Sequence, residues 1–276
     1  MGKLDGKAAV VTGGSSGIGR ATALALAAEG AAVAISGRKA SALEEVAGKI
    51  TALGGSVVSQ VVDVRDERQV AALVDAAVQQ FGRLDIMVNN AGVVYPGNIA
   101  DGSVEEWREM LETNVLALLI GCREAIRAMK ANGGGHIINV SSVAARETGP
   151  TGQVYSATKH AVNAISDGLR QEVHDSGIRV TVVMPGGTLT NIGRTLPQEV
   201  LDNAARALGV DPEAEGIRHG EYLSHERIEQ VLREHPGILL AANDVATAVL
   251  YAATQPPSVH VDEVMVRPSV GLNVGA

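Results

Sequence analysis

A strand, a glycine-rich loop and a helix follow one another within the first 30 residues. Residues 8–11 form a short, uncharged run of Ala and Val, which is typical of a strand buried on both faces. Residues 12–19 (Thr-Gly-Gly-Ser-Ser-Gly-Ile-Gly), called the glycine loop below, come next. Residues 20–29 are rich in Ala and stop at Gly30, as a helix does. This order of elements predicts the opening unit of an α/β fold.

The same alternation continues through most of the chain. Further strands are predicted at residues 32–36, 56–62, 84–88, 136–140, 179–184 and 259–266, and further helices at 41–53, 66–81, 104–130, 155–176 and 243–254. Strands that alternate with helices indicate a doubly wound parallel sheet, here a three-layer α/β/α fold of the Rossmann type. The 276 residues suffice for one such domain, and no internal repeat or linker divides them. We expect a single domain over residues 1–276.

The alternation lapses over residues 191–236, called the lid segment below. This stretch is polar and charged and contains Pro197, Pro212 and Pro236. A long excursion from a compact domain is usually a lid or a binding element, so we expect it to cover a substrate. Its candidate contacts are the apolar Leu196, Leu201, Ile217 and Tyr222 and the basic Arg194, Arg206, Arg218 and His219. Each of these side chains could equally be solvated.

Composition excludes several classes of partner. The net charge is −8 with no block of basic residues, which argues against nucleic acid. The single cysteine, Cys122, cannot form an internal disulfide and suits a reducing compartment. No apolar run approaches the roughly 18 residues of a membrane span, and the first residues lack an apolar signal region. We expect a cytoplasmic protein without membrane or nucleic-acid partners.

The glycine loop has the composition of a phosphate-binding loop. Glycines let the backbone approach a phosphate closely, and the N–H groups that open the following helix face its charge. The spacing Gly13…Gly17…Gly19 differs from the common Gly-x-Gly-x-x-Gly fingerprint. The alternative is a flexible loop without a ligand. The candidate ligand-binding residues of the loop are Gly13, Ser15, Ser16, Gly17, Ile18 and Gly19.

The end of the second predicted strand bears on the choice of cofactor. In dinucleotide folds an acidic residue about 20 positions after the glycine loop binds the ribose 2′-hydroxyl, whereas a nearby arginine accommodates a 2′-phosphate. This chain has Gly37 followed by Arg38 and Lys39, with no acid there. The pattern favours NADP(H) over NAD(H). The alternatives are that both cations are merely solvated, or that the protein prefers NAD(H).

Two further polar groups follow predicted strands. Asp63 and Val64 come after the third strand, and Asn89-Asn90-Ala91-Gly92 begins where the fourth one ends. Ligands of doubly wound sheets bind outside the carboxyl ends of the strands, so one ligand could contact these residues together with the glycine loop and Arg38. The alternative is that Asp63 and the two asparagines only cap helices or shape loops.

Tyr155 and Lys159 carry the clearest chemistry. Residues four apart lie on one face of a helix, so the phenol and the ammonium can point at the same spot. A nearby cation favours the phenolate and lowers a pKa that is normally about 10, which would let the tyrosine transfer a proton. Ser142 follows a predicted strand that can end beside this helix, and its hydroxyl could bind a substrate oxygen. Taken alone, Tyr-x-x-x-Lys could also be a chance pair on a solvated face.

Asn114 interrupts the long helical pattern of residues 104–130. Asparagine is unfavourable in the middle of a helix unless its amide has a specific hydrogen-bonding role. That role could belong to the active site, or Asn114 could be a satisfied amide of the core.

Together these motifs resemble the short-chain dehydrogenase/reductase family over residues 5–266. The resemblance is carried by the glycine loop, Asp63, Asn89-Asn90-Ala91-Gly92, Asn114, Ser142, Tyr155-x-x-x-Lys159 and residues 185–190. It implies a Rossmann-type enzyme that moves a hydride between a nicotinamide cofactor and an alcohol or carbonyl. It also implies a homodimer or homotetramer built on the helices predicted at 104–130 and 155–176.

The family resemblance also implies residue roles. Tyr155 would donate or accept the proton, and Lys159 would lower its pKa and hold the nicotinamide ribose. Ser142 would orient the substrate oxygen, and Asn114 would fix a helix bend and a water linking Lys159 to solvent. The implied cofactor contacts are Asp63 and Val64 with adenine, Asn90, Ala91 and Gly92 with the adjoining ribose, and Pro185, Gly186, Thr188 and Thr190 with the nicotinamide side.

The chain departs from many family members at its end. Residues 259–268 lack the Val-Asp-Gly-Gly type of ending and are more similar to NADP-dependent hydroxy-acid and polyketide-modifying dehydrogenases. That weakens an assignment to fatty-acid elongation. Two alternatives stay open, a cofactor-binding sensor or scaffold without catalysis, and an epimerase or dehydratase of the extended relatives. The occupied catalytic positions argue against the first, and the absence of a larger C-terminal domain argues against the second.

Overall fold

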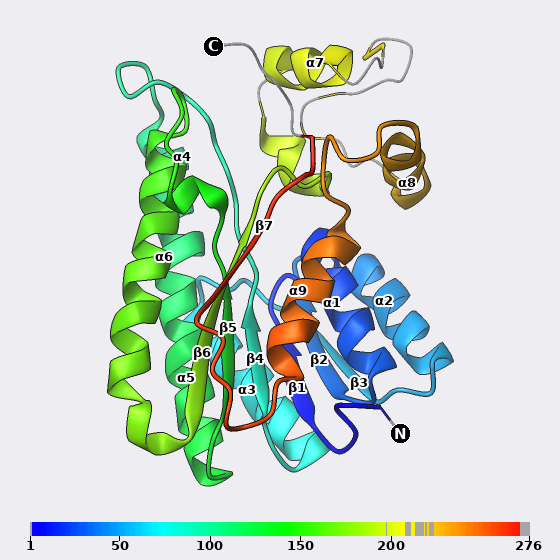
Figure 1. Ribbon diagram of the computed structural model, residues 1–276, viewed down its shortest axis with the longest axis vertical. Coiled ribbons are helices and arrows are strands. Elements are labelled where there is room, and N and C mark those ends of the chain that lie inside the picture. The colour runs from blue at the N-terminus through cyan, green and yellow to red at the C-terminus, as the bar shows by residue number, and fades with distance from the viewer. Residues whose placement is uncertain are drawn as a thin grey trace.

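The computed structural model describes residues 2–196, 198–207, 211–212, 218, 220 and 224–270. Within these residues seven parallel strands form one sheet in the order β3-β2-β1-β4-β5-β6-β7 (Figure 1). The strands are β1 (Ala8–Val11), β2 (Ala32–Gly37), β3 (Val57–Val61), β4 (Ile86–Asn89), β5 (Gly135–Val140), β6 (Ile178–Pro185) and β7 (Glu263–Val266). The doubly wound parallel sheet predicted from the sequence is confirmed.

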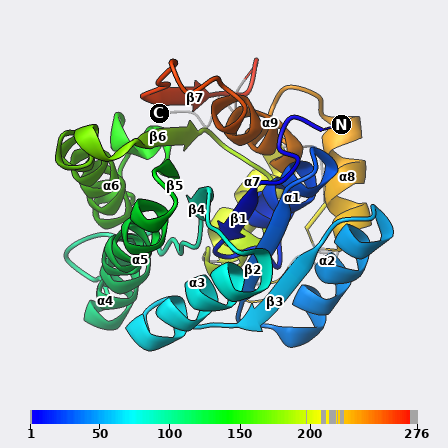
Figure 2. The ribbon, with the colours of Figure 1, turned by 90° about the horizontal axis from the view of Figure 1, so that it is seen from below.

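Helices cover both faces of the sheet and complete the three layers (Figure 2). One face carries α1 (Gly17–Ala28), α2 (Ala40–Ala52) and α9 (Ala242–Ala253). The other carries α3 (Glu67–Phe81), α4 (Val104–Leu111), α5 (Ala117–Ala131) and α6 (Gln153–Glu172). Successive strand residues point to opposite faces, so Val11 packs in the core beneath α1 and Val10 in the core beneath α3. Both cores consist largely of Ala, Val, Leu and Ile, which allows close packing of helix on sheet.

The strand order reverses at β1, which lies between β2 and β4. Chain connections therefore leave β1 and β4 toward opposite faces, and in doubly wound sheets the ligand-binding crevice is found at this switch point, at the carboxyl edge of the sheet. The carboxyl edge is the upper end of the sheet in Figure 1. The glycine loop follows β1, and Asn90 follows β4, so both lie at this crevice.

The predicted helix over residues 104–130 is divided in three. Helix α4 ends at Leu111, a π-helical turn η1 (Glu112–Leu116) follows, and α5 begins at Ala117. Asn114 lies in the middle of the π-turn and is buried. π-turns inside helices commonly mark functional sites. The position that interrupts the sequence pattern is therefore where the backbone changes its hydrogen bonding.

The last strand is shorter than the predicted span of residues 259–266, since only Glu263–Val266 pairs with β6. Before Glu263, side-chain hydrogen bonds take the place of backbone pairing with β6. The backbone N–H of Val180 donates to Nε2 of His260 at 3.1 Å, and the Arg179 guanidinium donates to the carbonyl of Val259 at 2.7 Å. With these groups already bonded, a regular ladder does not extend across residues 259–261, and the first backbone bond of the pair is from Val182 N–H to Asp262 O at 2.9 Å. The first helix also begins earlier than expected, at Gly17 instead of residue 20.

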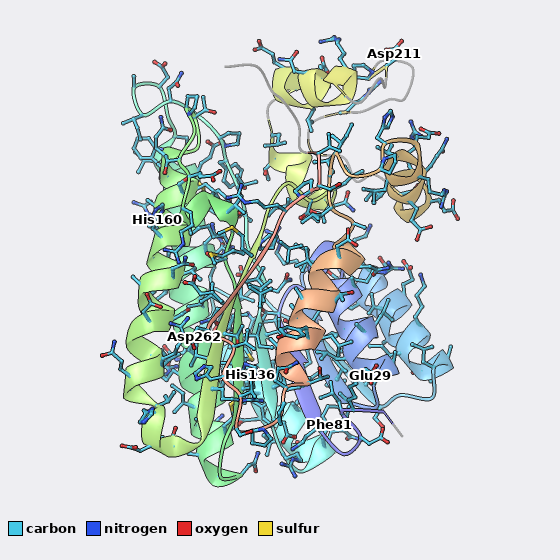
Figure 3. All side chains as sticks on the ribbon, viewed as in Figure 1. Glu29, Phe81, His136, His160, Asp211 and Asp262 are labelled. Carbon is cyan, nitrogen blue, oxygen red and sulfur yellow. The ribbon has the colours of Figure 1, made fainter. Side chains whose placement is uncertain are left out.

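Two polar side-chain networks are buried between the strands and helices. Asn89 Nδ2 donates to Asn139 Oδ1 at 2.9 Å, and Asn139 Nδ2 donates to Ser166 Oγ at 2.9 Å, which joins β4, β5 and α6. His136, labelled in Figure 3, lies within the sheet, and its Nε2 is 2.7 Å from Thr181 Oγ1. Burial lowers the pKa of His136 to about 3, so the ring is neutral at ordinary pH.

The lid segment lies above the carboxyl edge of the sheet (Figure 1). Its described elements are a 3₁₀ turn η4 (Asn191–Thr195), α7 (Gln198–Ala207) and α8 (His225–Glu234). The residues on either side of it are joined, because Leu189 N–H donates to Leu240 O at 3.0 Å and Leu240 N–H donates to Gly187 O at 2.8 Å. Ala205 and Val231 form a small buried cluster of its own. Ile217, His219 and Tyr222, named above as candidate contacts, lie outside the described residues.

Among the described helices, none is both long and apolar enough to cross a membrane.

Candidate active site

The glycine loop wraps the beginning of α1. Gly13 and Gly17 have positive φ angles of 68° and 52°, which L-residues with a side chain rarely adopt. A Cβ added to Gly19 would lie 2.2 Å from the carbonyl oxygen of Gly13, so only glycine fits there. Ser16 occupies the N-cap position of α1 without a side-chain cap hydrogen bond. The amides at the start of α1 therefore have no capping side chain, and they face the site as an anion-binding group would.

Thr12 and Asn90 hold the glycine loop against the end of β4. The Thr12 hydroxyl accepts hydrogen bonds from the backbone N–H of Asn90 at 3.0 Å and of Ala91 at 3.2 Å. Nδ2 of Asn90 donates to the carbonyl of Thr12 at 2.9 Å. The Asn90 side chain thus supports the loop directly, which is the loop-shaping alternative considered above. Thr12 was not among the predicted site residues, although a hydroxyl at the junction of strand and glycine loop was a signal for it.

Gly37 lies against the glycine loop. A Cβ at Gly37 would be 2.5 Å from Oγ and 2.8 Å from Cβ of Ser15. Arg38 follows at the carboxyl end of β2, with its side chain 57% exposed, and Lys39 occupies the N-cap position of α2. The predicted cationic pair is therefore placed beside the predicted phosphate-binding loop. Any side chain at position 37 would need Ser15 to move.

The side chains of Asp63 and Val64 have different surroundings. The Asp63 carboxylate accepts from Nε of Arg65 at 2.9 Å and from Nη2 of Arg65 at 2.5 Å, and this side-chain bonding lowers the pKa of Asp63. Val64 instead lines a small cavity together with Ala91 and Thr113. Val64 thus lines a water-sized cavity and Asp63 is bonded to Arg65, and the contact of both residues with adenine stays a prediction.

Ser142, Tyr155 and Lys159 converge at the carboxyl end of β5. Nζ of Lys159 lies 5.6 Å from the centre of the Tyr155 ring and donates to the carbonyl of Val140 at 3.1 Å. Ser142 makes a side-chain hydrogen bond with the Tyr155 phenol. The Ser142 hydroxyl also lies 3.4 Å from the carbonyl oxygen of Pro185, at the end of β6. The strand end and the helix bring together the three side chains that the sequence pattern singled out.

Burial controls the electrostatics of this group. Burial raises the pKa of the Tyr155 phenol, while the hydrogen bond with Ser142 lowers it by less. Burial also lowers the pKa of the Lys159 ammonium to about 8. The expected net lowering of the Tyr155 pKa by Lys159 is therefore wrong. The reason is that removal from water disfavours both charged forms, the phenolate and the ammonium.

Asn114 is fully bonded within the protein. Its Nδ2 donates to Val93 O at 2.9 Å and to Thr158 Oγ1 at 3.1 Å, and its Oδ1 accepts from the N–H of Val93 at 2.9 Å. These bonds attach the π-turn to the loop after β4 and to α6. Asn114, Lys159 and Val140 also line the cavity next to Val64, whose volume of about 10 Å³ is the size for one water molecule.

Residues 185–190 close the site from the side of β6. Pro185 ends the strand, and the N–H of Gly186 donates to Val266 O at 2.7 Å. The Thr188 hydroxyl donates to Gly186 O at 2.9 Å. Thr190 packs on the glycine loop, with its Cβ 3.1 Å from where a Cβ of Gly17 would lie. The segment implied to contact the nicotinamide side thus touches the loop implied to hold the phosphates.

The fold and this site define a class. A glycine loop that opens a helix at the switch point of a doubly wound parallel sheet is the hallmark of Rossmann-type dinucleotide-binding proteins. The family model described as "short chain dehydrogenase" matches residues 7–200. The chain belongs to the short-chain dehydrogenase/reductase family of NAD(P)-dependent oxidoreductases.

Two curated relatives illustrate the similarity. An uncharacterized oxidoreductase of Staphylococcus aureus is 35% identical over 265 residues, which cover 96% of this chain and 98% of that protein. Glycine betaine reductase ATRR of Emericella nidulans is 38% identical over 268 residues, which cover 97% of this chain. The chain spans only 19% of the length of that reductase.

Solved structures show the same fold. An alcohol dehydrogenase from Thermococcus sibiricus, complexed with 5-hydroxy-NADP, is 27% identical with a TM-score of 0.76 and coverages of 95% of this chain and 96% of that one. A 7α-hydroxysteroid dehydrogenase complexed with NADH and 7-oxo glycochenodeoxycholic acid is 28% identical with a TM-score of 0.77. The match covers 98% of this chain and 95% of that one. A short-chain enzyme from Mycobacterium marinum reaches a TM-score of 0.79 at 27% identity, with coverages of 96% and 95%.

The shifted pKa of Lys159 can be measured directly. In protein labelled with ¹³C at the lysine ε carbon, one NMR resonance should titrate near pH 8, because burial makes the neutral amine the favoured form above that pH. A lysine side chain in water, by comparison, stays charged to about pH 10. The resonance should be missing from Lys159→Met. A Lys159 resonance that shows no titration near pH 8 would contradict the prediction.

Proposed function

We propose that the protein transfers a hydride between NADP(H) and a small-molecule alcohol or carbonyl through Ser142, Tyr155, Lys159 and Asn114. The observation that carries the proposal is that the Ser142 hydroxyl bonds to the Tyr155 phenol while the Lys159 ammonium lies 5.6 Å from the centre of the same ring. This group stands beside the loop of residues 185–190, which itself packs on the glycine loop. A binding protein without catalysis would have no use for these three side chains together.

The chain's own residues fit a dinucleotide. The glycine loop, with Gly13, Ser15, Ser16, Gly17, Ile18 and Gly19, would hold the pyrophosphate at the uncapped start of α1. Val64 would contact adenine, and Ala91 and Gly92 the adjoining ribose, while Arg38 and Lys39 would meet a 2′-phosphate. Pro185, Gly186, Thr188 and Thr190 would border the nicotinamide side. NADP(H), when bound, supplies or accepts the hydride.

The raised pKa of Tyr155 keeps its phenol protonated at neutral pH, which suits the reduction of a carbonyl. As the substrate carbon receives the hydride, Tyr155 would give its proton to the substrate oxygen, held in place by the Ser142 hydroxyl. Lys159, charged below about pH 8, would stabilise the phenolate that remains. A water in the cavity beside Asn114 and Lys159 would return the proton from solvent.

We propose that the lid segment covers the substrate. Thr195 in η4 donates its hydroxyl proton to the carbonyl of Val94, in the loop that follows Gly92. The half-buried Leu196 and Leu201 remain candidate substrate contacts, whereas Arg206 is exposed and paired with Asp202 at 3.8 Å. Arg218 is exposed as well. The contact of Thr195 with Val94 ties the lid segment to the wall of the proposed site.

We also propose that the protein is a homo-oligomer, a dimer or a tetramer. Leu111, Leu116 and Leu119 are 51%, 48% and 43% exposed, and they lie close together along α4, η1 and α5. Large apolar side chains grouped in this way on a surface commonly mark a protein contact. This is one of the two helical stretches expected to form the subunit contact.

Replacement of Tyr155 by Phe tests the catalytic assignment. It should lower kcat by about 10²- to 10⁴-fold, because only the transferable proton is lost, and leave the Kd for NADPH nearly unchanged. NADPH absorbance with a panel of ketones and aldehydes measures the rate. Tyr251→Phe, on the exposed surface of α9, is the matched control and should retain full activity. Near-wild-type turnover in Tyr155→Phe would contradict the proposal, and a wild-type protein that binds NADPH without oxidising it would indicate a sensor.

Cofactor preference is tested by kcat/KM for NADPH and NADH on one substrate. The wild-type ratio should exceed one, and Arg38→Ala should lower it by about 10- to 100-fold, the loss expected for a charged hydrogen bond. Gly37→Asp with Arg38→Ile should invert the preference once Ser15 is also changed to Gly, because Ser15 occupies the space of the new Cβ. Gly37→Ala reports the steric effect alone. A wild-type ratio at or below one overturns NADP(H) as the cofactor.

The oligomer is tested by light scattering at micromolar concentration. The wild-type protein should show a multiple of 28.4 kDa. Leu116→Glu combined with Leu119→Glu should shift the mass to that of the monomer, since two charges would then be buried at the contact. Leu53→Glu, at an exposed apolar residue at the end of α2, should leave the mass unchanged. A monomeric wild-type protein refutes the proposal.

A further inference from the structure

An ion pair joins the two elements that flank the adenosine end of the proposed site. Nη1 of Arg38, after β2, lies 3.8 Å from Oε1 of Glu109 on α4. The helix leads directly to Thr113, which lines the cavity together with Val64 and Ala91. The arginine proposed to meet a 2′-phosphate therefore already faces a carboxylate from the opposite wall.

Glu109 is held in that position. The Tyr95 hydroxyl, in the loop after β4, donates to Oε2 of Glu109 at 2.8 Å, so that the other carboxylate oxygen faces Arg38. The Glu109 side chain is only 27% exposed, which limits how far it can swing away. This bond holds the carboxylate on the side away from Arg38. The charge of Glu109 therefore has a defined position, unlike that of a freely moving surface side chain.

The surrounding charges do not favour a 2′-phosphate as strongly as Arg38 alone would. The pKa of Arg65 is raised chiefly by its hydrogen bond with Asp63, and also by the charges of Glu109 and Glu112. Arg38 in turn helps to lower the pKa of Asp63. Two arginines thus share this corner with three carboxylates. A 2′-phosphate carries a charge of about −1.5 to −2 and would have to compete with Glu109 for Arg38.

We propose that Glu109, positioned by Tyr95, is a specificity-determining residue that weakens NADP(H) binding relative to NAD(H). It does so by pairing with Arg38 and by repelling the 2′-phosphate, whereas the uncharged 2′-hydroxyl of NAD(H) is indifferent to it. The inference rests on the proposed function. The pair is long and partly exposed, so its effect is moderate, and a 2′-phosphate can still displace it. Glu109 thereby reduces the preference for NADP(H) over NAD(H) that Arg38 creates.

The test is the Kd of NADPH and of NADH, measured by nicotinamide fluorescence at one ionic strength for the full chain. Glu109→Gln keeps the shape of the side chain and its acceptor for Tyr95 but removes the charge. It should tighten NADPH roughly two- to fivefold, as expected for removal of one partly exposed charge interaction, and leave NADH unchanged. Glu106→Gln, on an exposed position of the same helix, makes the same change in net charge and should alter neither value.

An Arg38→Ala background separates a pairing role from a structural one. There Glu109→Gln should tighten NADPH less than it does in the wild-type background, because the competition for Arg38 no longer exists and only the repulsion of the 2′-phosphate remains. Equal tightening of both cofactors, no change, or weaker NADPH binding in Glu109→Gln would each overturn the inference while leaving the proposed function intact. A wild-type protein that binds neither cofactor would overturn the proposed function and this inference with it.

Discussion

The hydrogen bonds between Thr12 and the start of the loop after β4 are the interactions on which the site depends. The Thr12 hydroxyl accepts from the N–H groups of Asn90 and Ala91, and the Asn90 amide returns a bond to the Thr12 carbonyl. These groups are part-buried, and a backbone group left unbonded away from water costs about 1–3 kcal/mol. By bonding them, these contacts hold two connections together at the place where the doubly wound topology makes them diverge. The glycine loop, and with it the start of α1, takes its position from that junction.

The two ends of the site differ in how far their charged groups are removed from water. At the catalytic end, Tyr155 and Lys159 are removed from water, so desolvation dominates and raises the one pKa while lowering the other. At the adenosine end, Arg38, Arg65 and Glu109 are at least partly exposed, where an ion pair contributes about 0–1 kcal/mol. In the proposed mechanism, burial therefore tunes the proton transfer, and a balance of weak, screened charges tunes the choice of cofactor.

Asn114 and the π-turn connect the site to the surrounding helices and loops. The amide of Asn114 reaches Val93 in the loop after β4 and Thr158 on α6, one residue before Lys159. The π-turn shifts the backbone so that this side chain points inward without breaking the long α4–α5 stretch. An asparagine that would weaken an ordinary helix is therefore stabilised by three hydrogen bonds that no other residue type supplies in the same shape.

The sequence by itself determined the alternating strands and helices, the position of the glycine loop, and the pairing of Tyr155 with Lys159. These features follow from local rules, namely the two periodicities, the backbone freedom of glycine and the spacing of one helical turn. Only the tertiary structure decided that Asn90 supports the glycine loop, that His260 bonds to Val180 beside the start of β7, and that Glu109 faces Arg38. It also decided the direction of the Tyr155 pKa. Each of these depends on which side chains meet across distant segments and how much water surrounds them, and neither quantity is encoded in any short stretch of the chain.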